Sequence, residues 1–377
     1  MLTNIKNLKV ALVHEELTQL GGAERVLDVL HEIFPKAPIF TLVWDRFKTQ
    51  HKYDKLDVRP SFIQKLPFAI KNYKWYLGLM PLAVESFNLK NFDLIISDAS
   101  ALVKGVKTKE DQLHICYCHT PTRYLWTDTK DYLKTAPIPK ILRPVMPLAI
   151  WFLRRWDLKA SKRPDFYIAN SRNIANKIYK YYHRDSTVIY PPVETDKFHL
   201  SPKLADYFFM VARLEPYKKV DLVIQAFNQL PRLKLKIAGG GTKQEEFAKI
   251  AGSNISFIGR VSDTKLAELY AHARAFIFPQ EEDFGITAVE AQAAGRPVVA
   301  FKKGGALESI IEGKTGEFFH PQTAEALVKV LKKFQSGKYN PKEVRAQALK
   351  FDKSLFKEKI KEYINSKLNN KILNQKS

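Results

Sequence analysis

The chain has 377 residues and a formal net charge of +22 at pH 7. This length exceeds what one hydrophobic core usually supports, so two domains are expected. Two cysteines exclude a disulfide scaffold, and no apolar run reaches the roughly 18 residues of a bilayer-spanning helix. The N-terminal residues lead directly into a strand-like segment, so no signal peptide is expected. The positive charge indicates an anionic partner: nucleic acid, acidic lipid headgroups or a phosphorylated substrate.

The first half of the chain alternates strand and helix patterns, beginning with a strand over residues 8–14. Gly21 and Gly22 follow it and precede apolar residues at helical spacing. A double glycine lets the backbone approach a ligand closely, and an ordinary tight turn is an equal alternative. Because the pair does not form GxGxxG, the dinucleotide fingerprint is absent, which argues against a dehydrogenase. Further strands are expected at residues 39–43, 93–97, 113–118 and 165–170, the last closing this domain.

Two segments, residues 62–90 and 133–156, mix aromatic and aliphatic side chains with lysine and arginine on short helices. This combination suits the surface of an anionic membrane. The alternative is that the helices simply cover the N-terminal sheet. The high net charge favours membrane docking.

His119 comes directly after the strand at 113–118 and is followed by Thr120 and Pro121. A histidine at a strand end, held by a proline turn, is expected to point into a cleft. A structural histidine is the alternative, and for a lone histidine it is the more common case. Cys116 and Cys118 lie in the same strand and are expected to be buried thiols in a reducing compartment.

A second domain is expected to begin near residue 205, with a strand at 208–212. Arg213 and Lys218 flank the following strand-to-helix turn, where two fixed cations can neutralise a diphosphate without a metal. A solvated basic loop is the alternative. The chain ends in a basic amphipathic helix at residues 351–368, and the residues from 369 are expected to fray.

The segment 278–305 reads as strand, loop, helix and strand of a parallel α/β domain. Its loop lies at the carboxyl end of a strand, where open α/β sheets bind ligands. Glu282 precedes the helix and Glu290 lies inside it, with seven residues between them. The helix N-terminus offers unpaired N–H groups to an anion, and two carboxylates can accept hydrogen bonds from sugar hydroxyls. Solvated glutamates on an amphipathic helix are the alternative.

This segment resembles the signature of glycosyltransferase family 4, which is a glutamate, seven residues and a second glutamate, with Phe-Gly after the first. The resemblance covers nearly the whole chain and is more specific in the second half. It implies the GT-B fold, an α/β architecture of two Rossmann-like domains that face one another across a cleft. Residues 1–196 would bind the acceptor and residues 205–351 the nucleotide sugar, with the helix at 352–368 crossing back to the first domain.

The resemblance also implies roles for individual residues. The expected catalytic residues are His119, Arg213, Lys218 and Glu282, with His119 near the reacting sugar and the two cations on the donor diphosphate. Glu282 would bind the transferred sugar and Glu290 the donor ribose. The remaining donor-binding residues would be Gly21, Gly22, Gly259, Arg260, Val261, Asp283, Phe284, Gly285 and Ile286.

Family members retain anomeric configuration and generally need no metal, so no metal or other cofactor is expected here. Asp283 stands where many members have glycine. The resulting segment, residues 281–285, resembles the form found in bacterial surface-polysaccharide mannosyltransferases. This resemblance favours mannose from GDP-mannose as donor. An equal alternative is that Asp283 caps the helix that follows it. A UDP-hexose donor stays open.

The acceptor expected from the resemblance is a saccharide hydroxyl, lipid-linked, at the cytoplasmic face of the plasma membrane, with peripheral contact to anionic lipid. A basic nucleic-acid-binding protein is the rival class. No nucleic-acid-binding motif is visible and the basic residues are spread along the chain, so no nucleic-acid partner is expected. A sugar-nucleotide-binding protein without activity is a further alternative.

Overall fold

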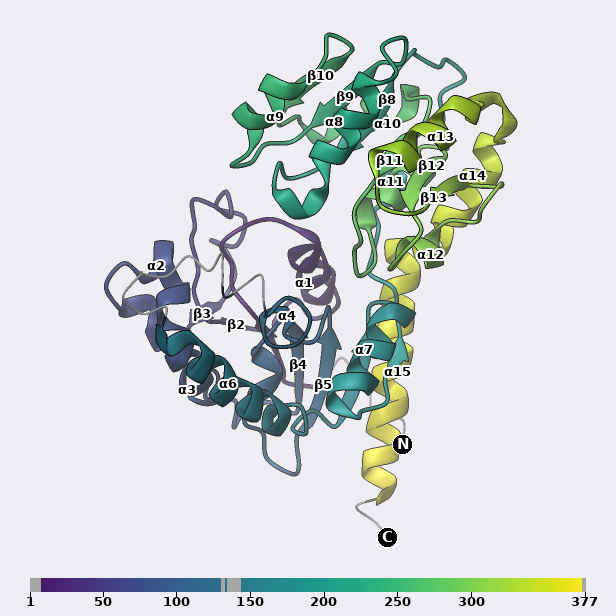
Figure 1. The fold of residues 1–377 in the computed structure, drawn as a ribbon. Coiled ribbons are helices and arrows are strands. Elements are labelled where there is room, and N and C mark those ends of the chain that lie inside the picture. Colours follow the sequence, from purple (N-terminus) through teal and green to yellow (C-terminus); the bar gives the residue numbers. More distant parts are fainter. Residues whose placement is uncertain (1–7, 130–132, 134–143, 375–377) are drawn as a thin grey trace. The chain divides into compact units, whose positions relative to one another are not determined.

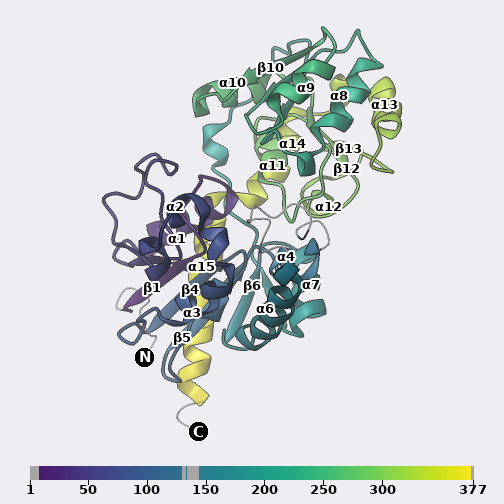
Figure 2. The ribbon, with the colours of Figure 1, turned by 60° about the vertical axis from the view of Figure 1, so that its left-hand side comes forward.

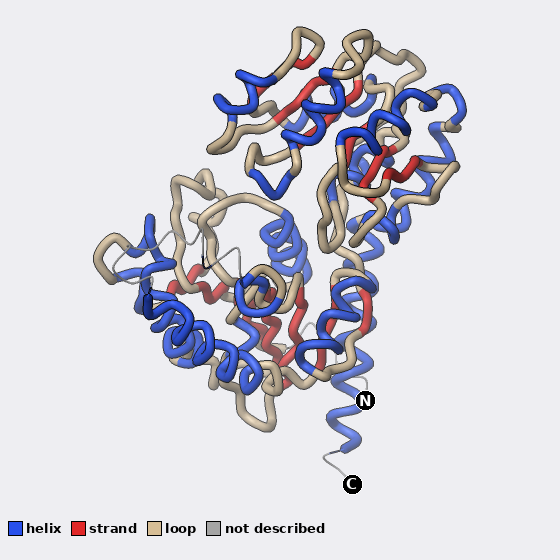
Figure 3. The backbone as a smooth tube through the Cα atoms, in the orientation of Figure 1, coloured by secondary structure: helices blue, strands red, loops and turns tan. Residues whose placement is uncertain are grey.

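The computed structural model describes residues 8–129, 133 and 144–374. Contacts divide the chain into two units, residues 1–190 with 356–377, and residues 191–355. Each unit has a parallel sheet with helices on both faces (Figure 1, Figure 3). Each is therefore a Rossmann-like α/β domain, as the sequence predicts.

The sheet of the first domain has seven parallel strands among the described residues, in the order β3-β2-β1-β4-β5-β6-β7. Alternate strand residues enter different cores, because both faces are covered. Leu12 and Ile96 pack with α1 and α15 on one face, whereas Val13 and Ile95 pack with α6 and α7 on the other. The elements are β1 Val10–His14, α1 Gly22–Ile33, β2 Ile39–Thr41, β3 Val58–Pro60, η2 Phe62–Lys65, α2 Ala69–Asn72, η3 Tyr73–Leu79, α3 Met80–Glu85, β4 Leu94–Ala99, η4 Val103–Gly105, β5 Leu113–Cys118, α4 Arg123–Trp126, α6 Met146–Ala160, β6 Phe166–Ala169, α7 Arg172–Tyr182, β7 Thr187–Val188 and α15 Lys353–Asn374.

The edges of this sheet differ from the expectation. The strand at 165–170 does not close the domain, because β7 pairs with β6 in parallel. β3 was likewise not predicted. Strands of two or three residues are too short to give an alternating pattern, so their positions depend on the strand beside them.

The sheet of the second domain has six parallel strands among the described residues, in the order β10-β9-β8-β11-β12-β13. The elements are η6 Thr195–Lys197, β8 Phe208–Val211, η7 Pro216–Lys218, α8 Val220–Asn228, β9 Leu235–Ala238, α9 Gln244–Ile250, β10 Ile255–Gly259, α10 Asp263–His272, β11 Phe276–Phe278, α11 Ile286–Ala293, β12 Val298–Phe301, α12 Ala306–Ser309, β13 Gly316–Phe319, α13 Ala324–Lys333, η8 Ser336–Lys338, α14 Pro341–Ala348 and η9 Leu349–Phe351.

The C-terminal helix α15 leaves the second domain and packs on the first, beside β5 and β6 (Figure 2). Phe356, Ile360, Ile364 and Leu368 recur every four residues and are buried in one core with α1. This spacing places them on one face of the helix. The helix extends to Asn374, beyond the expected fraying point at residue 369.

The strand order reverses between β1 and β4 in the first domain and between β8 and β11 in the second. At such a point the connections leave toward opposite faces of the sheet, which opens a crevice at the carboxyl ends of the two strands. Ligand sites are therefore expected at these two places.

Candidate active site

In the first domain, His14 ends β1 and Asp98 lies near the end of β4, directly opposite in the sheet register. Both side chains are almost fully buried. Nδ1 of His14 lies 2.8 Å from Oδ2 of Asp98. The strand-order reversal thus brings a carboxylate and an imidazole together at the carboxyl edge.

His119, the predicted catalytic histidine, joins this pair from the residue after β5. Its Nε2 lies 2.6 Å from Oδ1 of Asp98. Its backbone N–H donates to the carbonyl of Ala99 at 2.9 Å, and its own carbonyl accepts from Nδ2 of Asn170 at 3.0 Å. The side chain is 12 % exposed, so the ring is neither a sealed core residue nor freely solvated.

The predicted glycine pair connects to the same cluster. Gly21 is the N-cap residue of α1 and Gly22 its first residue. The N–H of Gly21 donates to Oε2 of Glu24 at 2.8 Å, and Oε1 of Glu24 lies 3.7 Å from Nε2 of His14. The glycine turn, Glu24, His14, Asp98 and His119 therefore form one continuous polar chain.

The charged groups of this polar cluster stabilise one another. Burial lowers the pKa of His14, but the hydrogen bonds to Asp98 and Glu24 outweigh it and raise that pKa from 6.5 to about 10. Burial raises the pKa of the Asp98 carboxyl, and the two histidines more than offset this, so the net shift is downward. The pKa of Glu24 is likewise lowered, because His14 outweighs the desolvation. At neutral pH the cluster contains a cationic His14 between two carboxylates.

Behind His119, a buried ion pair holds the turn that follows it. Nζ of Lys104 lies 2.5 Å from Oδ1 of Asp157, and both side chains are almost inaccessible to solvent. The same oxygen accepts from the hydroxyl of Thr122 at 2.9 Å, and Oδ2 accepts from Trp126 and Tyr182 at 2.8 Å. A buried charge pair is stable only with such additional hydrogen bonds, so this network holds Thr122, three residues after His119, against Asp157 of α6.

In the second domain, Arg213 and Lys218 lie on the connection from β8 to α8, as predicted. A glycine loop after β9 supports this connection. The N–H of Leu214 donates to the carbonyl of Gly240 at 3.1 Å, and a Cβ atom on Gly241 would lie 2.5 Å from the backbone oxygen of Leu214. A side chain at that position would displace the basic turn.

Lys218 and Glu282 are brought together across the switch point from β8 and β11. The ammonium group of Lys218 donates to Oε1 of Glu282, and the side chains are 15 % and 27 % exposed. Nε2 of Gln280 donates to the same oxygen at 3.0 Å. Two predicted residues, 64 positions apart in sequence, therefore form one charged cluster.

The loop that carries Glu282 rests on the double glycine after β12. The N–H of Gly305 donates to the carbonyl of Glu282 at 2.8 Å. Gly304 has φ +68°, and a Cβ atom on it would clash with the same carbonyl. Gly285, with φ +92°, is the N-cap residue of α11, and its missing side chain leaves room for the ring of Phe278. Asp283 precedes that position by two residues, so it does not occupy the N-cap position.

Glu290 is inside the domain and not on a solvated face. It is 2 % exposed, and Oε2 accepts from the hydroxyl of Tyr270 at 3.1 Å. The alternative of a solvated glutamate is therefore wrong for Glu290. Ile286, the first residue of α11, is half-buried, and Phe284 before it is buried.

Gly259, Arg260 and Val261 lie between β10 and α10. Gly259 adopts φ +68° and its carbonyl accepts from the N–H of Gly239 at 2.8 Å. A Cβ atom on Gly240 would lie 3.7 Å from Nε of Arg260, so this exposed arginine reaches the glycine loop.

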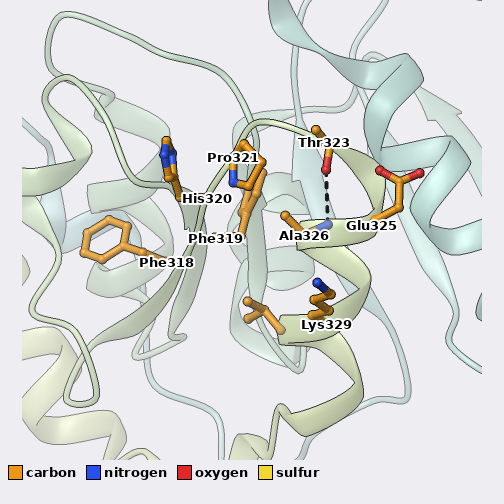
Figure 4. Close-up of a pocket in the computed structure, with 9 residues that line it drawn as sticks. Phe318, Phe319, His320, Pro321, Thr323, Glu325, Ala326 and Lys329 are labelled. Carbon is orange, nitrogen blue, oxygen red and sulfur yellow. Dashed lines mark hydrogen bonds between the residues drawn. The ribbon is translucent and has the colours of Figure 1, made fainter.

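A pocket of about 270 Å³ lies at the connection from β13 to α13 and contains none of the predicted site residues. Figure 4 shows His320 and Pro321 on one side of it and the first turns of α13 on the other. The hydroxyl of Thr323 caps that helix by accepting from the N–H of Ala326 at 3.3 Å. The Thr323 hydroxyl is thus used within the protein.

Sequence reasoning missed five residues that the structure adds to the clusters: His14, Glu24, Asp98, Tyr270 and Gln280. A signal was available for His14 and Asp98, since each is a polar residue at the carboxyl end of an apolar strand. No sequence pattern marks Gln280 or Tyr270. Their positions become meaningful only once the strands are ordered.

The two Rossmann-like domains have the GT-B fold. The family described as Glycosyltransferase Family 4 matches residues 20–197, and the family described as Glycosyl transferases group 1 matches residues 194–351. The chain belongs to glycosyltransferase family 4.

Relatives of known activity support this membership. An α-1,3/1,6-mannosyltransferase, ALG2, of Candida glabrata is 24 % identical over 81 % of this chain and 78 % of its own length. A D-inositol 3-phosphate glycosyltransferase of Mycolicibacterium paratuberculosis is 30 % identical over 40 % of each chain. The present chain therefore matches less than half of the length of that relative.

Solved structures share the fold across nearly the whole chain. Anabaena HepE in complex with UDP covers 95 % of this chain and 100 % of its own, with a TM-score of 0.69 and 17 % identity. Sucrose-phosphate synthase from Thermosynechococcus elongatus covers 96 % and 100 %, with a TM-score of 0.72 and 16 % identity.

Proposed function

We propose that this protein transfers a hexosyl group, with retention of anomeric configuration, from a nucleotide sugar to a hydroxyl of a saccharide acceptor. The observation that carries the proposal is the contact between Lys218 and Glu282 at the β8–β11 switch point. A cation suits the donor diphosphate, and a carboxylate beside it suits the hydroxyls of the attached sugar.

In this proposal the chemistry is electrostatic. Arg213, Lys218 and the N–H groups at the start of α11 hold the departing diphosphate, whose charge grows in the transition state. Glu282 orients the hexose. Glu290 already accepts from Tyr270 and would accept a further hydrogen bond from the donor ribose. No metal is required, because the two side-chain cations and the helix N-terminus supply positive charge.

We propose GDP-mannose as the donor. The support is Asp283, a carboxylate one residue from Glu282, together with the likeness to a mannosyltransferase over most of the chain. Epimers differ in hydroxyl direction, so one well-placed acceptor discriminates between them through the polar groups left unpaired. A UDP-hexose is the second candidate.

The test is a competition between sugar nucleotides, measured by calorimetry and by turnover. GDP-mannose, UDP-glucose, UDP-galactose and UDP-N-acetylglucosamine are titrated into the same protein. We expect GDP-mannose to bind tightest. Asp283→Asn should reduce the difference in Kd between GDP-mannose and the UDP-sugars. Tighter binding of any UDP-sugar would show that GDP-mannose is not the donor, and the transferase proposal would still stand. No binding of any sugar nucleotide would overturn both.

The proposed acceptor is lipid-linked, at the cytoplasmic face of the plasma membrane, as in surface-polysaccharide synthesis. The support is a docking face of exposed apolar side chains on two segments, η2 to α3 and α6. The two segments are in contact, because Nε1 of Trp156 in α6 donates to Glu85 of α3 at 2.8 Å. Residues 134–143 of the predicted docking segments lie outside the described residues. The exposed apolar side chains include Phe68, Ile70, Trp75, Leu79, Leu82, Leu148, Trp151 and Phe152, and exposed cations beside them are Lys65, Lys71, Lys74 and Arg155.

The helices of the docking face also cover the sheet, so both alternatives drawn from the sequence describe part of them. Ile150 and Leu153 of α6 are buried, whereas Trp151 and Phe152 are more than half exposed. Among the described residues no helix is long and apolar enough to cross a membrane. The proposed contact is therefore peripheral and would combine apolar insertion with attraction to anionic lipid.

Vesicle co-sedimentation tests this part of the proposal. Binding to anionic vesicles should exceed binding to neutral ones and weaken with salt, since screening acts over about 8 Å at physiological ionic strength. The double variant Trp151→Ser/Phe152→Ser should bind less. Leu349→Ser, which changes an exposed leucine of the second domain, is the control. Equal binding to both vesicle types would contradict the electrostatic account.

A further inference from the structure

The carboxylate of Asp98 is fully buried between two histidines, and each of its oxygens contacts one of them. Oδ2 lies 2.8 Å from Nδ1 of His14, and Oδ1 lies 2.6 Å from Nε2 of His119. These contacts come from three neighbouring strands, because β4 lies between β1 and β5. The arrangement resides at the centre of the first domain's sheet.

We propose that Asp98 is a positioning residue for His119, and that His14 is the fixed cation that keeps Asp98 ionised. The proposal deepens the proposed function and rests on it in one respect, namely that His119 contacts the reacting sugar or its acceptor. Neither Asp98 nor His14 touches substrate in this account.

The chemistry of the hydrogen bonds defines what Asp98 does. An ionised carboxylate can only accept, so both histidines must donate to it. His119 therefore carries its proton on Nε2, and Nδ1 is the ring nitrogen left available to a ligand. A neutral, protonated Asp98 would instead donate to Nε2 and move the ring proton to Nδ1, which would reverse the polarity that His119 presents.

His14 makes the ionised form of Asp98 stable. A buried carboxylate without a counter-charge takes up a proton, because the low dielectric disfavours the charge. His14 supplies that counter-charge and is held on its other side by Glu24, whose oxygen lies 3.7 Å away. Consistent with this geometry, the pKa of His14 is raised to about 10 although burial opposes it.

The backbone of His119 does not depend on Asp98. Its N–H is bonded to Ala99 and its carbonyl to Asn170, and the Lys104–Asp157 network holds the following turn. Removing the carboxylate should therefore free the ring without displacing the loop. This separation makes a positional effect distinguishable from a general loss of structure.

The experiment compares Asp98→Asn with Ser97→Ala. Ser97 is the adjacent residue of β4 and makes its own buried hydrogen bond to a histidine, with Oγ 2.9 Å from Nε2 of His114. The control thus removes a buried histidine contact from the same two strands, away from His119. Asparagine keeps the shape of aspartate but cannot accept from both histidines.

Three quantities are measured: kcat, the Kd of the sugar nucleotide, and the ring-nitrogen chemical shifts of isotope-labelled histidine, with His119→Ala assigning the signal. In D98N we expect kcat to fall roughly 10- to 100-fold, an unchanged nucleotide Kd, and loss of the fixed Nε2–H tautomer. S97A should keep both kcat and the His119 signal. Adding D98N to His119→Ala should cost no further activity.

If D98N does not fold, His14→Gln decides, since glutamine keeps a donor for Asp98 but removes the cation. We then expect His119 to shift toward the Nδ1–H tautomer. An unchanged tautomer in the folded variant, or a D98N enzyme as active as S97A, would overturn the proposal. If the wild-type protein transfers no sugar, the proposed function fails while the ring signals still decide whether Asp98 positions His119.

Discussion

The two domains have the same strand order around the switch point but build their ligand edges differently. In the first domain the edge is a chain of interlocked side chains, with Asp98 fully buried between His14 and His119. In the second, the charged residues are partly exposed and the backbone beneath them is shaped by glycines, such as Gly304 under the carbonyl of Glu282. Buried pairs fix protonation states, whereas glycine-supported loops place charges where a ligand can displace their contacts.

The largest effect should come from the cations of the second domain. Lys218→Ala or Arg213→Ala should lower turnover by roughly 10²- to 10³-fold, because charge-assisted bonds to the diphosphate strengthen as the leaving group gains charge. Ground-state binding of the nucleotide should fall less. Steady-state kinetics and calorimetry separate the two quantities.

The control for the cations is Lys243→Ala, since Lys243 pairs with Glu246 at 2.5 Å on the surface of the same domain. It should leave turnover unchanged. Wild-type turnover in either Lys218→Ala or Arg213→Ala would show that this residue does not bind the diphosphate. The partly exposed charges of the second domain would then have no demonstrated role in donor binding.

Glu282→Gln should lower turnover roughly 10- to 100-fold with the fold intact, because it keeps the shape but loses the charge beside Lys218. Glu281→Gln is the matched control, as Glu281 pairs with Lys303 at 2.9 Å on the outer side of the loop. Turnover and thermal unfolding of both variants are compared. Equal turnover in the two variants would show that the charge of Glu282 does not act on the sugar.

The buried histidine–carboxylate cluster of the first domain should make the stability of the protein depend on pH. The folded pKa of His14 is raised from 6.5 to about 10, so its stabilisation is complete below pH 6.5 and is lost as pH rises toward 10. Between pH 7 and 9 the free energy of unfolding should fall by up to about 2 kcal/mol more in the wild type than in His14→Gln. Urea unfolding across this range measures the difference, and parallel curves would contradict the charged pair.

His114 provides an internal comparison for that measurement. Burial, together with the nearby cations Arg163, Arg184 and Lys371, lowers its pKa to about 3. A group with a depressed basic pKa loses stabilisation as pH falls below 6.5, the opposite direction to His14. In His114→Gln the free energy of unfolding should therefore fall less at acidic pH than in the wild type. Its decrease between pH 7 and 9 should be the same as in the wild type.

The smallest effect should come from the glycine support. Gly304→Ala should weaken donor binding by about tenfold or less, because a Cβ atom pushes the carbonyl of Glu282 and the backbone has φ +68°. Gly313→Ala is the matched control, since Gly313 has φ +76° with open space around its Cβ position. The difference in nucleotide Kd isolates the contact from the backbone strain, and identical Kd values would place the double glycine outside the donor site.

The sequence determined the elements that carry strong local patterns. Long apolar strands and the helix after Glu282 predicted a parallel α/β architecture, and the apolar pattern of residues 351–368 predicted an amphipathic C-terminal helix. Its place on the first domain was implied only by the resemblance to the family. The resemblance to the family added the positions of Arg213, Lys218 and Glu282, and the structure brings the last two into contact. These features were predictable because they depend on periodicity and on residues close in the chain.

Tertiary structure decided which polar residues became a site. His14, Asp98 and His119 are separated by 84 and 21 positions, and only the order β1-β4-β5 brings them together. The burial of Glu290 and the shift in the pKa of His14 depend equally on neighbours from other elements. Hydrogen bonding and electrostatic interactions act through space, so their partners cannot be read from sequence separation; strand order supplies them.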